Sequence, residues 1–178
     1  MPKLRDFMGQ ELRWTQPQAL RREYELRAGD TVLATLGFRS MLGSLATLQS
    51  EDGSWTFKRI GFWRSHVTVR ALNQDIDLAV FTNNTWSSGG TLAMADGRHF
   101  RANSNFWMTK YQFTDDRDEP VVQFTRVGGV IHLSSTVLVT PAGAKLEELP
   151  WLVALGWYLS IKMHDDSAGG AAAAAAAG

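Results

Sequence analysis

The residues best suited to chemistry are basic side chains in two neighbouring stretches that alternate in polarity. In the first stretch Trp55 and Phe57 share one face of an expected strand, so Lys58 lies on the opposite face. In the second stretch Val67 and Val69 are expected to point inward. The alternation therefore predicts an outward-facing basic patch that consists of Lys58, Arg64, His66 and Arg70, with Arg59 near the end of the hairpin.

This predicted patch favours a binding function over catalysis. Lys and Arg side chains that gather on one surface attract anionic phospholipid headgroups, and Trp63 is typical of an aromatic residue at a membrane interface. A protein partner is the other occupant that we expect. An ordinary solvated sheet face, on which Lys and Arg discourage edge pairing, is the alternative interpretation. A second basic cluster, Arg98, His99 and Arg101, allows the same alternative.

Other reactive residue types lack the patterns that catalysis or metal binding needs. The chain has no cysteine, which excludes disulfides, thiolate zinc sites and a cysteine nucleophile. The histidines have no metal-ligand spacing, and the acidic run from Asp115 to Glu119 does not match an EF-hand loop. We therefore predict no cofactor, no metal site and no enzymatic activity. An enzyme whose site is assembled from distant residues remains an alternative.

Composition and charge narrow the partners and the location. Lys and Arg together number 18, as do Asp and Glu, so the formal net charge is zero and no global field attracts nucleic acid. No apolar stretch is long enough to span a bilayer, and the N-terminal residues lack the apolar stretch of a secretion signal. We expect a cytoplasmic monomer that is at most peripheral to a membrane.

Short alternating stretches separated by turn residues dominate the chain and predict an all-β domain. Asp52-Gly53 and Asp96-Gly97 are typical of tight hairpins, as is Gly29-Asp30. The pattern predicts about twelve strands, near residues 10–15, 20–27, 31–38, 44–49, 54–60, 64–72, 76–82, 90–95, 98–103, 107–114, 120–126 and 130–139.

The sequence also contains an internal repeat with an offset of 44 residues. Thr47-Leu48 corresponds to Thr91-Leu92, and Phe62-Trp63 corresponds to Phe106-Trp107. Each copy reads as a unit of four strands with one apolar face, which cannot be stable alone. Two such units side by side indicate one large curved sheet.

The stretch from Leu149 to Ile161 is apolar on every face, which predicts a helix that is buried all round. It is too short to cross a bilayer. Pro150 suits the first helical turn, Gly156 indicates close approach of a strand backbone, and the helix is expected to end near His164.

Geometry connects the helix to the strands. A closed barrel of about twelve strands is too wide for its own side chains to fill, so something must occupy its interior. The sequence therefore predicts an all-β fold with one C-terminal helix, namely a closed β-barrel around a central buried apolar helix. This domain is expected to span residues 1–166, followed by a disordered Ala/Gly tail at 167–178. If the helix instead lay outside, the barrel could carry a small apolar ligand.

This order of elements resembles the tubby C-terminal-like superfamily, which includes the phospholipid scramblases and the LURP-one-related proteins. Two stretches carry the resemblance, Tyr24–Leu36 with the following Thr47–Gly53, and the terminal helix. The resemblance implies a barrel closed around a buried helix. Members of this superfamily are linked to membrane phosphoinositides or phospholipids. The calcium-binding segment of scramblases has no counterpart, since Thr140–Glu148 lacks a ladder of oxygen ligands. The resemblance thus implies a phospholipid-binding module without scrambling activity.

Overall fold

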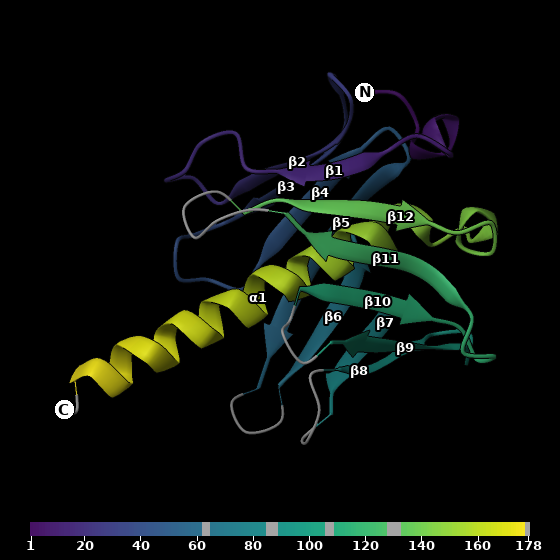
Figure 1. The fold of residues 1–178 in the computed structure, drawn as a ribbon. Coiled ribbons are helices and arrows are strands. Elements are labelled where there is room, and N and C mark those ends of the chain that lie inside the picture. The colour runs from purple at the N-terminus through teal and green to yellow at the C-terminus, as the bar shows by residue number, and fades with distance from the viewer. Residues whose placement is uncertain (62–64, 85–88, 106–108, 128–132, 177–178) are drawn as a thin grey trace.

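The computed structural model describes residues 1–61, 65–84, 89–105, 109–127 and 133–176, with side chains as far as Gly169. Its twelve strands pair antiparallel in chain order, and β1 pairs with β12 to close the barrel (Figure 1). The prediction of a twelve-stranded barrel closed around one C-terminal helix is therefore confirmed.

The strand bounds lie within a few residues of those predicted, with one exception at β12, which begins at Ser135 instead of residue 130. Residues 128–132, where the sequence places the start of that strand, lie outside the described residues. The strands are β1 (Leu12–Thr15), β2 (Glu23–Ala28), β3 (Thr31–Phe38), β4 (Ala46–Ser50), β5 (Gly53–Ile60), β6 (His66–Ala71), β7 (Asp77–Asn83), β8 (Gly90–Met94), β9 (His99–Ser104), β10 (Lys110–Thr114), β11 (Pro120–Arg126) and β12 (Ser135–Val139).

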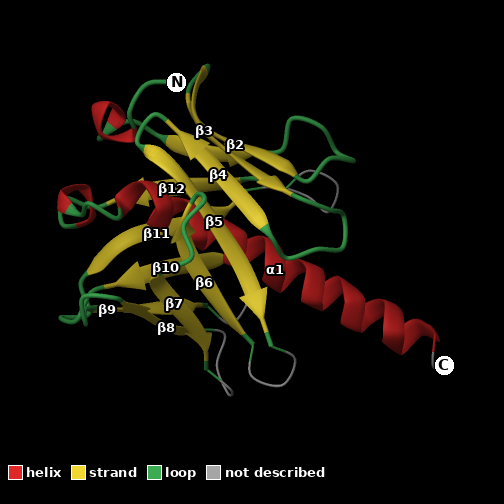
Figure 2. Ribbon diagram, turned by 180° about the vertical axis from the view of Figure 1, so that it is seen from behind, coloured by secondary structure: helices red, strands yellow, loops and turns green. Residues whose placement is uncertain are grey.

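The helix α1 (Leu149–Ala176) enters at one end of the barrel, runs through its interior and leaves at the other end (Figures 1 and 2). Every residue from Leu149 to Leu159 is buried, as the apolar stretch predicts. The helix does not end near His164, however, as the sequence predicts. Instead α1 continues to Ala176, and its last six residues are alanines, which favour the helix.

Aromatic rings on the barrel wall hold the helix from several sides. The Trp157 ring stacks on Trp14 at 6.2 Å between centroids and meets Tyr24 edge-on. On another side the Tyr158 ring stacks on Phe38 at 5.5 Å, and its hydroxyl donates to the Ser44 carbonyl oxygen at 2.6 Å. These contacts fix the rotation of α1 within the barrel.

Gly156 makes room for aromatic side chains and not for a strand backbone, as the sequence had suggested. A Cβ atom at this position would collide with the ring of Phe124 and come within 3.2 Å of Phe113. The rings of two neighbouring strands therefore occupy the space that a side chain at Gly156 would need.

The 44-residue repeat is visible in part of the barrel. β4 and β8 correspond residue for residue, and both Leu48 and Leu92 are fully buried. In β3 and β7 the correspondence shifts by one residue. Leu36 points inward in β3, whereas in β7 the inward-facing residue is Phe81, one position beyond the repeat partner of Leu36. A one-residue shift exchanges the two faces of a strand, so the sequence repeat is kept only where the register is kept.

The strands meander up and down, so alternate connections lie at the same end of the barrel. We call one end the closed end; it contains residues 1–11, 29–30, 51–52, 72–76, 95–98, 115–119 and 140–148. Two short helices lie here, η1 (Leu4–Phe7) and η2 (Gly143–Lys145) (Figure 1). We call the other end, where α1 leaves, the mouth; its described part contains residues 16–22, 39–45 and the ends of the adjoining strands.

Candidate functional site

The predicted basic patch has the expected faces but not the expected charge. In the β5–β6 register Lys58 pairs with Thr68 and Thr56 with Arg70, so Lys58, His66 and Arg70 do share the outward face. The Arg70 Nε donates to Asp77 at 2.5 Å, and Asp75 lies 3.9 Å from its guanidinium.

The hydrogen bond with Asp77 raises the pKa of Arg70, and the two carboxylates neutralise its charge. Arg64 lies outside the described residues. Among the described members of the patch, Lys58 is the cation with no carboxylate within ion-pair distance. A single cation is a weak basis for anion binding.

Arg59 belongs to a different surface from the one predicted. Strand alternation places it on the inward face with Phe57, opposite Val67. There its Nη1 donates to both carboxylate oxygens of Asp166 on α1, at 2.8 and 3.0 Å. The sequence does not predict this pairing, because a helix that ends near His164 does not reach Asp166.

The second basic cluster is also neutralised. Arg98 donates to Asp96 at 2.7 Å and to Glu148, which precedes α1, and these hydrogen bonds raise the pKa of Arg98. Arg101 donates to Asp118 at 2.5 Å. Neither arginine is available for an external anion without breaking an ion pair.

Where α1 leaves the mouth, charged side chains of the helix and of the barrel meet, and we call this group the collar. Arg22, at the start of β2, donates to Asp165 at 2.6 Å, and Lys162 donates to the same carboxylate at 3.1 Å. The Arg22 guanidinium lies 4.0 Å from the centroid of the Phe38 ring and also donates to the Met41 carbonyl oxygen at 2.7 Å. Arg22 thus ties the loop 39–45 to the helix.

Arg126 contributes a further cation to the collar. Its Nη2 lies 3.1 Å from Nδ1 of His164 on α1. Burial, and then the charge of Arg126, lower the pKa of His164, so the neutral imidazole accepts the hydrogen bond at neutral pH. In the described part of the chain no carboxylate lies within ion-pair distance of Arg126.

The zero net charge of the chain hides a separation of charge between the two ends. The described connections at the mouth contain no Asp or Glu, and their neighbourhood carries cations: Arg21, Arg22, Arg39, Arg59, Lys110, Arg126 and Lys162. Glu23, Asp165 and Asp166 are the acids near them. The closed-end connections carry mostly acids: Asp6, Glu11, Asp30, Glu51, Asp52, Asp75, Asp96, Asp115, Asp116, Asp118, Glu119, Glu147 and Glu148.

Exposed apolar side chains accompany the cations at the mouth. Leu42 is 99% exposed, Leu20 87% and Met41 61%. Ile60 and Val127 lie partly exposed at the ends of β5 and β11. Soluble surfaces rarely gather such side chains with arginines on one rim, and a combination of this kind marks an interaction surface.

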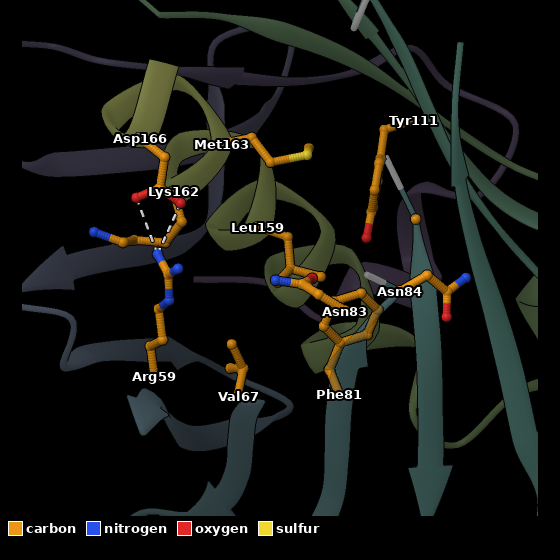
Figure 3. Close-up of a pocket in the computed structure, with 11 residues that line it drawn as sticks. Arg59, Val67, Phe81, Asn83, Asn84, Tyr111, Leu159, Lys162, Met163 and Asp166 are labelled. Atoms are coloured by element: carbon orange, nitrogen blue, oxygen red, sulfur yellow. Dashed lines mark hydrogen bonds and ion pairs between the residues drawn. The ribbon is translucent and has the colours of Figure 1, made fainter. Parts of the chain in front are cut away.

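Two crevices flank α1 just inside the mouth. The first has a volume of about 180 Å³ and lies between the helix, β5–β7 and Tyr111 of β10 (Figure 3). The second, of about 90 Å³, lies between the helix and β10–β12. Tyr111 borders both. Among the described residues its buried hydroxyl has no hydrogen-bond partner, and burial raises the pKa of this phenol.

The sequence contains a signal that distinguishes the mouth from the closed end. In an up-and-down barrel every second connection lies at the same end. The Gly-Asp and Asp-Gly hairpins, which we did recognise, therefore all lie at the closed end. The alternate connections, such as 16–22 and 39–45, are longer, free of acids and contain arginine.

Some expected features lie outside what the structure describes. Trp63, Trp86 and Trp107 lie in segments whose placement is not described. Among the described residues no group of three or more His, Asp or Glu side chains could hold a metal ion. No described helix is long and apolar enough to span a membrane.

Comparisons with known proteins found no match. No family model, no curated protein and no solved structure is significantly similar to this chain.

Proposed function

We propose that this protein is a non-enzymatic, tubby-like barrel module that binds anionic phospholipid surfaces with its mouth. The observation that carries the proposal is the combination, on one rim, of exposed Leu20, Met41 and Leu42 with arginines in connections that lack acids. The binding surface differs from the β5–β6 outer face that the sequence suggested, since Arg70 there is neutralised.

The expected free energy of membrane binding is a sum of several small contributions. Each Lys or Arg near an anionic membrane surface contributes about 1 kcal/mol, and the contribution falls off within a Debye length of about 8 Å. Arg21, Arg39 and Arg126 are exposed and have no carboxylate within ion-pair distance among the described residues. Insertion of an exposed leucine adds about 1.5–3 kcal/mol when its side chain is fully buried. Several such terms together give reversible peripheral binding.

The acidic residues of the closed end favour a single orientation of the protein on an anionic membrane. Its acidic connections would be repelled by the same surface that attracts the mouth. The opposed charges of the two ends therefore turn the molecule before contact, with α1 pointing towards the membrane.

Two other functions considered from the sequence have less support. A carrier that holds an apolar ligand in the centre of the barrel needs an empty interior, whereas α1 occupies it (Figure 1). For an enzyme, no observation among the described residues favours a particular reaction. A protein partner with an acidic surface remains the outcome to consider if lipid binding fails.

The test is co-sedimentation of the full chain with vesicles of phosphatidylcholine alone or with 30% phosphatidylserine, at about 50 and about 150 mM salt. We expect binding that requires the anionic lipid and weakens with salt. Equal sedimentation with both vesicles, or none with either, would overturn the proposal.

Matched variants locate the surface. We expect Met41→Ser with Leu42→Ser to weaken binding at least tenfold, because the inserted side chains are lost. The control is Ile76→Ser, which removes a side chain that is 72% exposed at the closed end and should change nothing. Arg21→Gln with Arg39→Gln should weaken binding mainly at low salt, whereas Arg117→Gln at the closed end should not.

A further inference from the structure

The larger crevice at the mouth has the features of a small-ligand site. It lies between α1 and β5–β7, and its floor is apolar, formed by Val67, Phe81, Leu159 and Met163 (Figure 3). Charged and polar groups stand at its edges. Apolar walls with a few convergent polar groups are typical of sites that bind small molecules.

The Tyr111 hydroxyl supplies the first polar group. Figure 3 shows it pointing into the space beside Leu159 and Asn83. The residue is 5% exposed, and in the described part of the chain its hydroxyl has no hydrogen-bond partner. A buried donor is costly when left unsatisfied, so this hydroxyl favours a ligand that brings an acceptor into the crevice.

Two cations supply the next polar groups. Arg59 uses only Nη1 to bind Asp166, so Nε and Nη2 keep their donors. Lys162 makes one hydrogen bond, to Asp165, and an ammonium group has three donors. Both side chains line the crevice, together with one carboxylate, that of Asp166. The unused donors favour an anionic ligand.

Size and polarity together define the class of ligand. A volume of about 180 Å³ is below the 300–1,000 Å³ of sites for drug-sized molecules, so the ligand is short. We propose that the crevice binds a short-chain amphipathic carboxylate, whose tail lies against Val67, Phe81 and Leu159. Its carboxylate accepts a hydrogen bond from Tyr111, and the positive charges of Arg59 and Lys162 across the crevice attract it.

This site goes beyond the proposed membrane function and does not depend on it. A dissolved carboxylate can enter the crevice in the absence of any vesicle. Vesicle binding, in turn, rests on the exposed loops 16–22 and 39–45, which do not line this crevice. Failure of one proposal therefore leaves the other intact.

The first experiment is a titration of the full chain, followed by two-dimensional NMR, with hexanoate, acetate and 1-hexanol as separate probes. Hexanoate should bind at least tenfold more tightly than acetate, which lacks the tail, and than hexanol, which lacks the charge. Equal affinity for acetate would mean adventitious anion binding only. Equal affinity for hexanol would mean an apolar crevice without anion recognition. Either result overturns the proposal.

Variants of the lining residues then test the geometry. Tyr111→Phe keeps the ring and removes the hydroxyl, so hexanoate affinity should fall at least fivefold while the fold is kept. Arg59→Gln should lower it at least tenfold. Arg27→Gln is the matched control, because Arg27 and Arg59 both hold a carboxylate at 2.8 Å and their side chains are 33% and 30% exposed. Loss of affinity in Arg27→Gln as well would contradict the site.

Val67→Phe provides a steric test, because the larger side chain projects into the crevice and should abolish hexanoate binding. Circular dichroism and thermal unfolding show whether the variant is folded. Tyr111→Phe should also leave vesicle binding unchanged, since its hydroxyl is buried. A folded Val67→Phe variant that still binds hexanoate would place the ligand elsewhere and refute the proposal.

Discussion

The two ends of the barrel hold the same helix by different means. At the closed end α1 begins among fully buried side chains such as Leu149 and Leu152, and η1 packs Leu4 against the core. At the mouth the helix is held by ion pairs, in which Asp165 and Asp166 meet Arg22 and Arg59. Ion pairs therefore add to the aromatic packing of Tyr158 at the mouth, whereas apolar packing contributes most at the closed end.

This difference explains where binding features lie. The closed end has tight hairpins and η1, whose Leu4 N–H donates to Asp52 at 2.8 Å. The mouth has longer loops, exposed leucines and crevices beside the helix. Sites for ligands commonly lie where a rigid scaffold presents loops, and the loops with exposed leucines and arginines lie at the mouth.

The largest effect should come from replacing one leucine of α1 by alanine near each end of the barrel. Leu152→Ala, near the closed end, should lower the free energy of unfolding by about 4 kcal/mol, because a fully buried leucine leaves a cavity. Leu159→Ala borders the crevice at the mouth and should cost about 2 kcal/mol, since solvent reaches the vacated space. Urea unfolding of both variants gives the comparison. Equal losses would show that the mouth is packed as tightly as the closed end.

Smaller effects should follow when one arginine is removed at each end. Arg22→Gln should lower the free energy of unfolding by about 2 kcal/mol, because hydrogen bonds to Asp165 and to the Met41 carbonyl oxygen are lost. Arg98→Gln should cost about 1 kcal/mol, because its side chain is 45% exposed and the helix N-terminus still favours the Glu148 carboxylate. Thermal unfolding measures both. A larger loss for Arg98→Gln would reverse the assignment of ion pairing to the mouth.

The smallest effect is a change in the pH dependence of stability, which should also differ between the two ends of the barrel. Burial and Arg126 lower the pKa of His164 in the folded protein, so protonation favours the unfolded chain. Its contribution to stability is present above the unfolded pKa of about 6.5 and is lost as the pH falls through the folded pKa. His164→Gln should therefore flatten the stability profile between about pH 7 and 5. His99→Gln, at the closed end, is the control; a similar flattening there would argue against a role of the mouth.

Individual residues show which features of the fold and of the candidate site the sequence predicts. The apolar stretch from Leu149 predicts the buried helix, since no other environment suits side chains that are apolar on every face. Lys58 and Arg70 were placed on the correct face because strand alternation is local. The partners of Arg70 and Arg59 could not be read, because Asp77 and Asp166 reach them through strand pairing and through the path of the helix.

The sequence by itself determined the hairpins, the number of strands, the helix that must be buried and the zero net charge, because these depend on local pattern or composition. Only the tertiary structure decided which charges share an end, that Arg59 faces the helix, and that Tyr111 lies in a crevice without a partner. The physical reason is that closure of the barrel and the path of α1 bring together residues far apart in the chain. Electrostatic and packing energies depend on those distances and not on separation along the sequence.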